Sequence, residues 1–366
     1  MSGTTARETT AGNVGRAVDA VLREAGGGRM AGVRTAYEFG RQVFVVQFVR
    51  GSWLCAATVD AATGDVLTIQ DEGLPVADAN IPDGEPAAVT LRPGFSTVWD
   101  VCATAESPDT AYVATGAGVA VVRLCRDVEA TLVVEDHHVT GFGVTRHVAP
   151  VPGGVVASTA DGRMFGMDTT GRLRWKTRLP GCPHTVTADA AGARVLAATN
   201  AGAVELDAGT GAEQGRFGGS VRAAAYLPNG DRIVADHRGD LIVTAARGRA
   251  CRRMSYGAFP DRLWVDHDRI YVAGEDGVKE FVAGYGVVAR WSAPGAGTVE
   301  NAVVIDGSVF TCSGGSRLDR HGYATAAHHG RLRVIADPEA LTALEVGRRP
   351  WLLVGHRDGR LSALPV

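Results

Sequence analysis

The chain has 366 residues, of which 45% are hydrophobic and 21% are charged. This composition is typical of a globular protein, and a chain of this length can bury a large core without disulfide bonds. The formal net charge of −3 leaves no overall basic character, so nucleic acid is not an expected partner.

Cysteine spacing and hydropathy limit the cellular compartments to consider. The six cysteines are scattered and form no Cys-x-x-Cys pair, which excludes zinc-ribbon and thioredoxin-like sites. Residues 1–15 are polar, without the apolar segment of a signal peptide, and no apolar run reaches transmembrane length. We therefore expect a cytoplasmic protein with six free thiols and no membrane partner.

The N-terminal region is predicted to be a disordered tail over residues 1–12 and a small α+β module over residues 13–72. Five apolar residues at helical spacing form one stripe: Val14, Val18, Val21, Leu22 and Ala25. Asn13 is placed to cap this helix. Strand-like runs follow, with a turn over residues 60–64 before the last: VRTAYEF, QVFVVQFV, WLCAATV and VLTIQ.

The end of this module, VDAATGDVL, resembles a PepSY-type module. That resemblance implies peptidase inhibition or extracytoplasmic binding. The same residues also resemble a turn of the repeat described next, so an extra repeat is the alternative. Gly51 would be its turn glycine, but it lies 67 residues before Gly118, too far for the repeat. We favour a separate appendage, joined by a linker over residues 73–86.

From residue 87 onward, one phrase recurs: an apolar strand, a small polar turn with glycine, and a second apolar strand. The turn glycines are Gly118, Gly162, Gly202, Gly239, Gly277, Gly315 and Gly359. Their spacing of 37 to 44 residues matches a four-stranded propeller blade. The last phrase ends at Val366, one strand short, so AAVTL at residues 87–91 is predicted to supply the missing strand.

Two stretches resemble known propeller families. DGRMFGMDTTGRLRW resembles the repeat of pyrroloquinoline-quinone-type propellers, and VWDVCATAESPDTAYVATG resembles a WD-repeat blade. The resemblance implies an all-β, seven-bladed β-propeller over residues 87–366. Quinoprotein dehydrogenases of the resembled type are secreted, eight-bladed and carry adjacent cysteines. This chain has no Cys-Cys pair, so we expect no quinone and no other cofactor.

Polar residues just before or within the inner strands are the candidate ligand-binding residues, because propeller ligands usually meet one mouth of the channel. They are Asp100, His138, Arg146, Arg222, Arg262 and Glu339, with His184 and Glu300 as weak catalytic candidates. The pairs His137-His138 and His328-His329 predict no metal site, because adjacent strand residues point to opposite faces.

Two functions remain open. The sequence has no Gly-x-Ser-x-Gly motif, P-loop or dinucleotide fingerprint. We therefore favour a monomeric, non-enzymatic scaffold that binds a protein or small molecule at the channel mouth. The alternative is a lyase, isomerase or hydrolase that uses His184 and Glu300 on a small molecule.

Overall fold

The computed structural model describes residues 5–25, 29–38, 41–50, 53–71, 87–90 and 97–366, apart from short segments inside the last range. These segments are residues 105, 127–129, 246–249, 268, 283–285, 292–296, 314–316, 333 and 335. The chain divides into two compact units, Met1–Ala79 and Asn80–Val366. The linker predicted over residues 73–86 lies outside the described residues.

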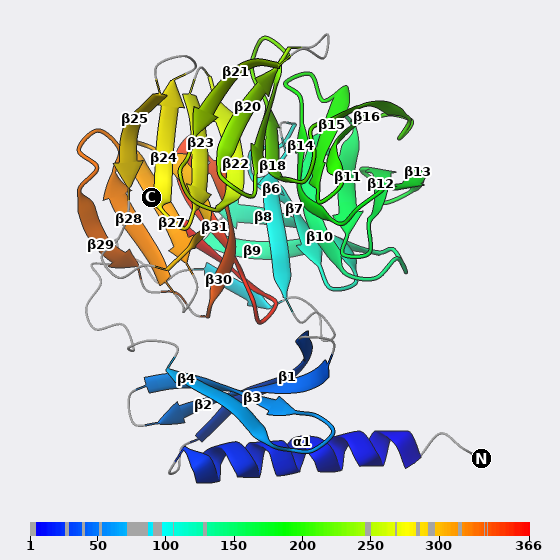
Figure 1. Ribbon diagram of the computed structural model, residues 1–366, viewed down its shortest axis with the longest axis vertical. Coiled ribbons are helices and arrows are strands. Elements are labelled where there is room, and N and C mark those ends of the chain that lie inside the picture. The colour runs from blue at the N-terminus through cyan, green and yellow to red at the C-terminus, as the bar shows by residue number, and fades with distance from the viewer. Residues whose placement is uncertain are drawn as a thin grey trace. The chain divides into compact units, whose positions relative to one another are not determined.

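The N-terminal unit packs one helix on one antiparallel sheet (Figure 1). The helix is α1 (Thr5–Glu24), and the sheet order is β1 (Arg29–Glu38), β2 (Arg41–Arg50), β3 (Trp53–Asp60) and β4 (Val66–Asp71). Val21 and Ala25 of the predicted stripe lie with Phe44 and Val59 in a buried core, which Ala17 also joins. None of the helices that the structure describes is long and apolar enough to cross a membrane.

The predicted tail is wrong from Thr5 onward, because α1 begins there and not at Asn13. Residues 5–8, Thr-Ala-Arg-Glu, include alanine, arginine and glutamate, which all favour helix, so the helix extends past the predicted cap. The predicted turn after β3 is present: the Asp60 carboxylate accepts the backbone N–H groups of Ala62 and Thr63 at 2.8 and 3.0 Å. These hydrogen bonds lower the pKa of Asp60.

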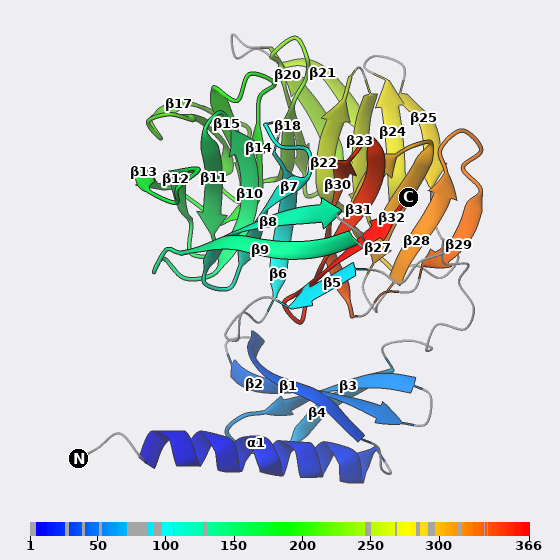
Figure 2. The ribbon, with the colours of Figure 1, turned by 180° about the vertical axis from the view of Figure 1, so that it is seen from behind.

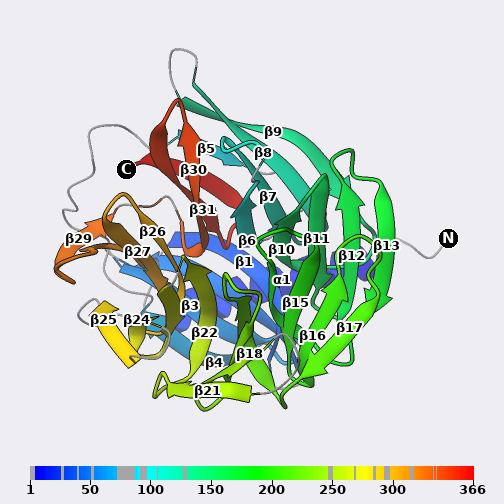
Figure 3. The same cartoon turned by 90° about the horizontal axis from the view of Figure 1, so that it is seen from above.

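The second unit contains seven four-stranded antiparallel sheets within its described residues (Figures 1 and 3). The first strands are β6 (Val98–Ala103), β10 (Thr145–Val151), β14 (Pro183–Ala188), β18 (Val221–Tyr226), β22 (Pro260–Asp266), β26 (Val299–Ile305) and β30 (Pro338–Val346). The second strands are β7 (Thr110–Thr115), β11 (Gly154–Thr159), β15 (Arg194–Thr199), β19 (Arg232–Asp236), β23 (Arg269–Gly274), β27 (Ser308–Ser313) and β31 (Arg349–His356). The third strands are β8 (Gly118–Arg126), β12 (Arg163–Asp168), β16 (Gly202–Asp207), β20 (Asp240–Thr244), β24 (Gly277–Val282), β28 (Arg317–Gly322) and β32 (Arg360–Pro365). The fourth strands are β9 (Ala130–Val139), β13 (Leu173–Arg178), β17 (Glu213–Phe217), β21 (Ala250–Ser255), β25 (Gly286–Trp291), β29 (His328–Leu332) and β5 (Ala87–Thr90).

The strand β5 completes the last sheet, as predicted from the missing fourth strand (Figure 2). It pairs antiparallel with β32, with Val89 opposite Leu361 and Ala88 opposite Ser362. The first strands of successive sheets also contact one another in order, and β30 contacts β6. The sheets therefore form a closed cycle around their first strands, which Figure 3 shows end-on.

Apolar layers between neighbouring sheets hold the cycle together. One such layer joins the first and last sheets through Val113, Leu124, Leu353 and Leu361, all almost fully buried. The outer strands add tryptophan contacts between sheets: Trp175 donates its indole N–H to the Ala208 carbonyl at 2.8 Å. A buried donor satisfied in this way fixes how one sheet sits against the next.

The turn glycines serve two different purposes. Gly162 has a φ of 86°, which only glycine adopts without strain. Gly118 does not have a positive φ, but a Cβ there would lie 2.0 Å from the His138 carbonyl oxygen. Close approach of the neighbouring strand explains that glycine. Gly315 lies outside the described residues.

Candidate functional site

The first strand of every sheet in the second unit has a register irregularity at its second residue. A bulge inserts one residue without a partner on the neighbouring strand, and it re-aims that side chain. The seven bulge residues are Trp99, Arg146, His184, Arg222, Asp261, Glu300 and Glu339. All seven line one cavity of about 450 Å³, which we call the channel mouth.

Most of the predicted site residues lie at this mouth. Arg146, His184, Arg222, Arg262, Glu300 and Glu339 all line the cavity. Asp100 is buried beside it, and its carboxylate accepts a hydrogen bond from Arg262 Nη2 at 2.8 Å. Sequence reasoning missed Trp99 and Asp261, the two remaining bulge residues.

His138 is not a mouth residue, so that prediction is wrong. It lies on β9, a fourth strand, and its ring packs against the backbone of Gly171. The chain continues in β9 as far as Val139, and β10 begins only at Thr145. The segment that leads to the inner strand is therefore residues 140–144, which follow His138.

An ion pair lies beneath the bulge residues. Asp100 is on β6 and Arg262 is on β22, two first strands that are not neighbours in the cycle. Their contact therefore reaches across the channel. Although burial lowers it, the Asp100 carboxylate raises the pKa of Arg262 overall. His147, whose Nδ1 lies 3.9 Å from Asp100 Oδ2, is kept neutral because burial lowers its pKa to about 4.

His184 and Arg222 form a fixed pair at the mouth. Arg222 donates from Nη1 to His184 Nδ1 at 3.0 Å and from Nη2 to Asp261 Oδ1 at 2.7 Å. An arginine only donates, so Nδ1 is the acceptor and the ring proton of His184 is on Nε2. Burial, with the charge of Arg222, lowers the pKa of His184 to about 4. His184 is therefore neutral near pH 7.

Glu300 and Glu339 share one arginine. Arg357 donates from Nη2 to both carboxylate oxygens of Glu300 at 2.8 Å, and from Nε to Glu339 Oε2 at 2.6 Å. Burial, against the pull of Arg357, raises the pKa of Glu339, and the nearby Glu300 adds to this rise. The acids on this side of the mouth thus have a counter-charge from the protein itself.

Arg146 is bound differently from the other arginines of the mouth. Its guanidinium carbon lies 3.9 Å from the centre of the Trp99 ring, so the cation rests on an aromatic face. Within the described part of the chain it forms no ion pair, and its Nε is buried without a hydrogen-bond partner. Burial lowers the pKa of Arg146, as expected for a cation without a bonded carboxylate.

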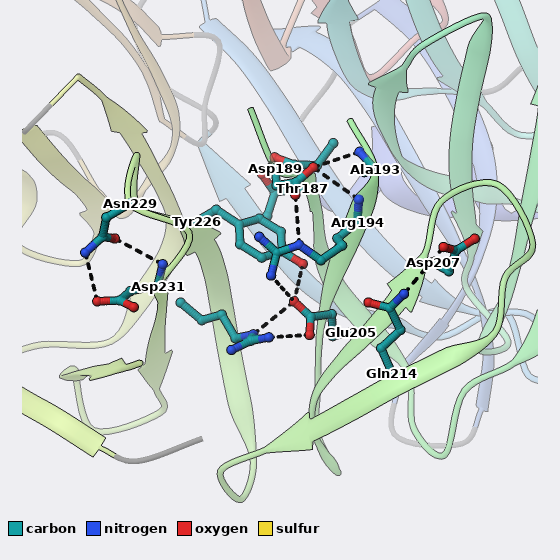
Figure 4. Close-up of polar contacts among 12 residues, drawn as sticks. Thr187, Asp189, Ala193, Arg194, Glu205, Asp207, Gln214, Tyr226, Asn229 and Asp231 are labelled. Carbon is teal, nitrogen blue, oxygen red and sulfur yellow. Dashed lines mark hydrogen bonds and ion pairs between the residues drawn. The ribbon is translucent and has the colours of Figure 1, made fainter. Parts of the chain in front are cut away.

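A second polar cluster, centred on Glu205, offers a contrast (Figure 4). The hydroxyl of Tyr226 and Nε of Arg232 each donate to Glu205 Oε1 at 2.9 Å, and Arg194 Nη1 adds a third bond at 3.4 Å. Arg194 Nε also donates to Asp189 at 2.9 Å. These bonds join two neighbouring sheets, because Glu205 lies on β16, whereas Tyr226 lies on β18 and Arg232 on β19.

The two catalytic candidates, His184 and Glu300, bind different arginines. Arg222 binds His184, and Arg357 binds Glu300; the described residues show no hydrogen bond between the two. A histidine with a pKa near 4 is a weak base at neutral pH. No group of three His, Cys, Asp or Glu residues that could hold a metal occurs in the described residues.

The chain is similar to solved structures. The WD40 beta propeller domain of Doa1 superposes with a TM-score of 0.62 and 14% identity, over 76% of this chain and 96% of that chain. The fold is a β-propeller. A computationally designed protein, Ika8, superposes with a TM-score of 0.53 and 15% identity, over 93% of this chain and 96% of that chain. No protein-family model and no curated protein sequence matches this propeller chain.

Proposed function

We propose that this chain is a non-enzymatic binding protein, a seven-bladed β-propeller that holds a partner at its channel mouth. The observation that carries the proposal is the ring of bulge residues. Seven equivalent positions direct polar or aromatic side chains into one cavity of about 450 Å³. A rigid ring that presents side chains in this way is suited to recognition.

Binding is favoured over catalysis because the acids of the mouth are bonded to arginines and its histidine is a weak base. Asp261, Glu300 and Glu339 each bind an arginine, and His184 stays neutral. A general base works best with a pKa near the working pH, and the pKa of His184 lies well below it.

The remaining proposals concern the whole chain. We propose a cytoplasmic monomer in which the N-terminal unit is a PepSY-like appendage and the propeller repeat is of the quinoprotein type. Four cysteines, Cys102, Cys125, Cys182 and Cys312, are free thiols, consistent with the expectation of unpaired cysteines. The side chains of Cys55 and Cys251 lie outside the described ones.

Blocking the mouth without removing a charge tests this function. Thr298 lines the cavity, and Thr298→Trp would fill part of it. Leu173→Trp, at an exposed position on β13, adds the same bulk away from the mouth. Proteins and metabolites retained from native lysate should be lost with Thr298→Trp and kept with Leu173→Trp. Equal retention by both folded variants would contradict docking at the mouth.

A further inference from the structure

The bulge residues divide into two halves of opposite hydrogen-bonding character. Trp99, Arg146, His184 and Arg222, from four consecutive sheets, form the donor half. Each has one ring or guanidinium nitrogen that is shielded from solvent without a hydrogen-bond partner among the described residues: Trp99 Nε1, Arg146 Nε, His184 Nε2 and Arg222 Nε. Since His184 Nδ1 accepts from Arg222, all four of these nitrogens are donors.

Asp261, Glu300 and Glu339 form the acid half, and each of these carboxylates pairs with an arginine of the protein. Arg222 binds Asp261, and Arg357 binds Glu300 and Glu339. Arg262 is likewise bound to Asp100. Glu275, the other acid of the mouth, accepts the backbone N–H of Phe259 at 3.4 Å. Within the described residues, Arg146 is therefore the arginine of the mouth without a carboxylate partner.

The positive charge of Arg146, which stacks on Trp99, has no carboxylate partner among the described residues, so an anionic acceptor is the missing component of the donor half. The stacking of Arg146 on Trp99 holds the guanidinium in place, so less side-chain entropy is lost when a ligand binds. A carboxylate offers two oxygens in one plane, which match the two parallel N–H donors of a guanidinium.

The acid half restricts the charge that this ligand can carry. The negative charge of Glu339 already acts on Arg146, and Glu300 lines the same cavity. A phosphate with nearly two negative charges would be repelled by these carboxylates, whereas a carboxylate carries one charge. The Asp100–Arg262 pair crosses the channel below, so the mouth suits the end of a side chain better than a threaded segment.

We propose that the mouth binds the carboxylate of an aspartate or glutamate side chain on a partner protein, and that Arg146 receives it. This inference rests on the proposed function, because it names the group that the mouth recognises. In this arrangement the partner's carboxylate contacts the donor half. Neighbouring polar or basic groups of the same partner segment contact the acid half.

Selection from random peptides displayed on phage tests the proposal with the full-length protein. Parallel selections use the unaltered protein, Arg146→Met, Arg146→Lys, and Arg178→Met as a control at an exposed arginine on β13. The unaltered protein and Arg178→Met should enrich an acidic residue at a fixed position of the peptide. A selected peptide should bind roughly 10- to 100-fold more weakly to Arg146→Met, with Arg146→Lys between. The matching Glu→Gln peptide should lose a similar factor, and the two losses should not add.

Several outcomes would overturn this assignment. Equal binding of the Glu and Gln peptides, or an Arg146-dependent pool without acidic enrichment, would exclude a carboxylate while the mouth remained the binding site. Displacement of the peptide by inorganic phosphate more readily than by acetate at equal ionic strength would exclude the preference for a single charge. Peptides that bind equally to Thr298→Trp, or a selection without enriched peptides, would count against the mouth itself. Melting temperatures of all variants establish that each is folded.

Discussion

Two glutamates that bind arginine, Glu205 and Glu300, differ in how far water reaches them. The Glu205 side chain is 3% exposed and its partner Arg232 is 5% exposed, whereas Glu300 and Arg357 are 31% and 40% exposed. Removing one member of a buried pair leaves the other charge without compensation, but a pair in contact with water is largely solvated already. The same substitution at the two positions therefore separates a structural contact from a surface one.

We expect Glu205→Gln to lower the free energy of unfolding by about 3–5 kcal/mol, because the buried Arg232 loses its counter-charge. Glu300→Gln should lower it by less than about 1 kcal/mol. Urea denaturation of the two variants measures both values. Similar losses at the two positions would show that burial does not determine how much these ion pairs contribute to the free energy of unfolding.

The sequence predicts five of the seven bulge residues because they stand where the inner strands begin. It misses the rule behind them: the residue after a Val, Thr or Pro that starts each first strand is the bulge residue, as in Val98-Trp99, Thr145-Arg146 and Pro260-Asp261. Aligning the seven strand starts could have revealed this position. The pairing of Arg222 with His184 could not be predicted, because it depends on the distance between neighbouring sheets.

At the scale of elements, the last sheet is built from two distant parts of the chain. The strand β5 comes from residues 87–90, and its partner β32 comes from residues 360–365. Sequence reasoning could find this pairing because the repeat leaves one strand missing at the end. The start of α1 was predicted less well, because a cap residue at Asn13 does not stop helix formation before it.

Removing β5 should destabilise the propeller, whereas removing the first unit should not. A variant that begins at Asn80 keeps β5, and one that begins at residue 91 leaves β32 as an open edge. We expect the second variant to melt at a lower temperature and to aggregate more readily. Addition of a peptide covering residues 85–92 should restore part of its melting temperature. Identical melting of the two variants would contradict the closing role of β5.

At the scale of the whole molecule, four histidines are kept neutral. Burial is the largest cause in each case, and it lowers the pKa of His147, His184, His321 and His356 to about 4. His356 is fully buried, with its Nδ1 bonded to the Ala336 carbonyl at 2.9 Å and its Nε2 to the Ser362 hydroxyl at 2.7 Å. These four histidines therefore bind fewer protons in the folded protein than in the unfolded chain between pH 6.5 and 4.

We expect the free energy of unfolding to fall as the pH is lowered from about 6.5 to 4. In this range the histidines become protonated in the unfolded chain but stay neutral in the folded protein. A single buried histidine such as His356 contributes a slope of up to about 1.4 kcal/mol per pH unit. Aspartates such as Asp161, whose pKa is lowered by the Thr159 hydroxyl, add to the fall only as the pH drops below about 5, so the upper part of this window reports the histidines.

Urea denaturation at closely spaced pH values measures this slope. His356→Gln should flatten it between pH 6.5 and 4, even though the variant is less stable at pH 7. A slope that His356→Gln leaves unchanged would contradict a neutral His356 in the folded protein.

The repeated bulge separates what the propeller recognises from what holds it together. Each bulge side chain lies outside the regular ladder, while the residues that follow it, such as Val101 and Leu263, belong to the buried layers. Substitution at a bulge therefore alters the chemistry of the mouth at little cost to folding. Several of these positions are linked, because Arg222 bonds both His184 and Asp261, and Glu300 and Glu339 share Arg357. A new specificity would therefore require coordinated changes at linked positions. The same ring could be re-engineered for a different ligand by rewriting these residues alone.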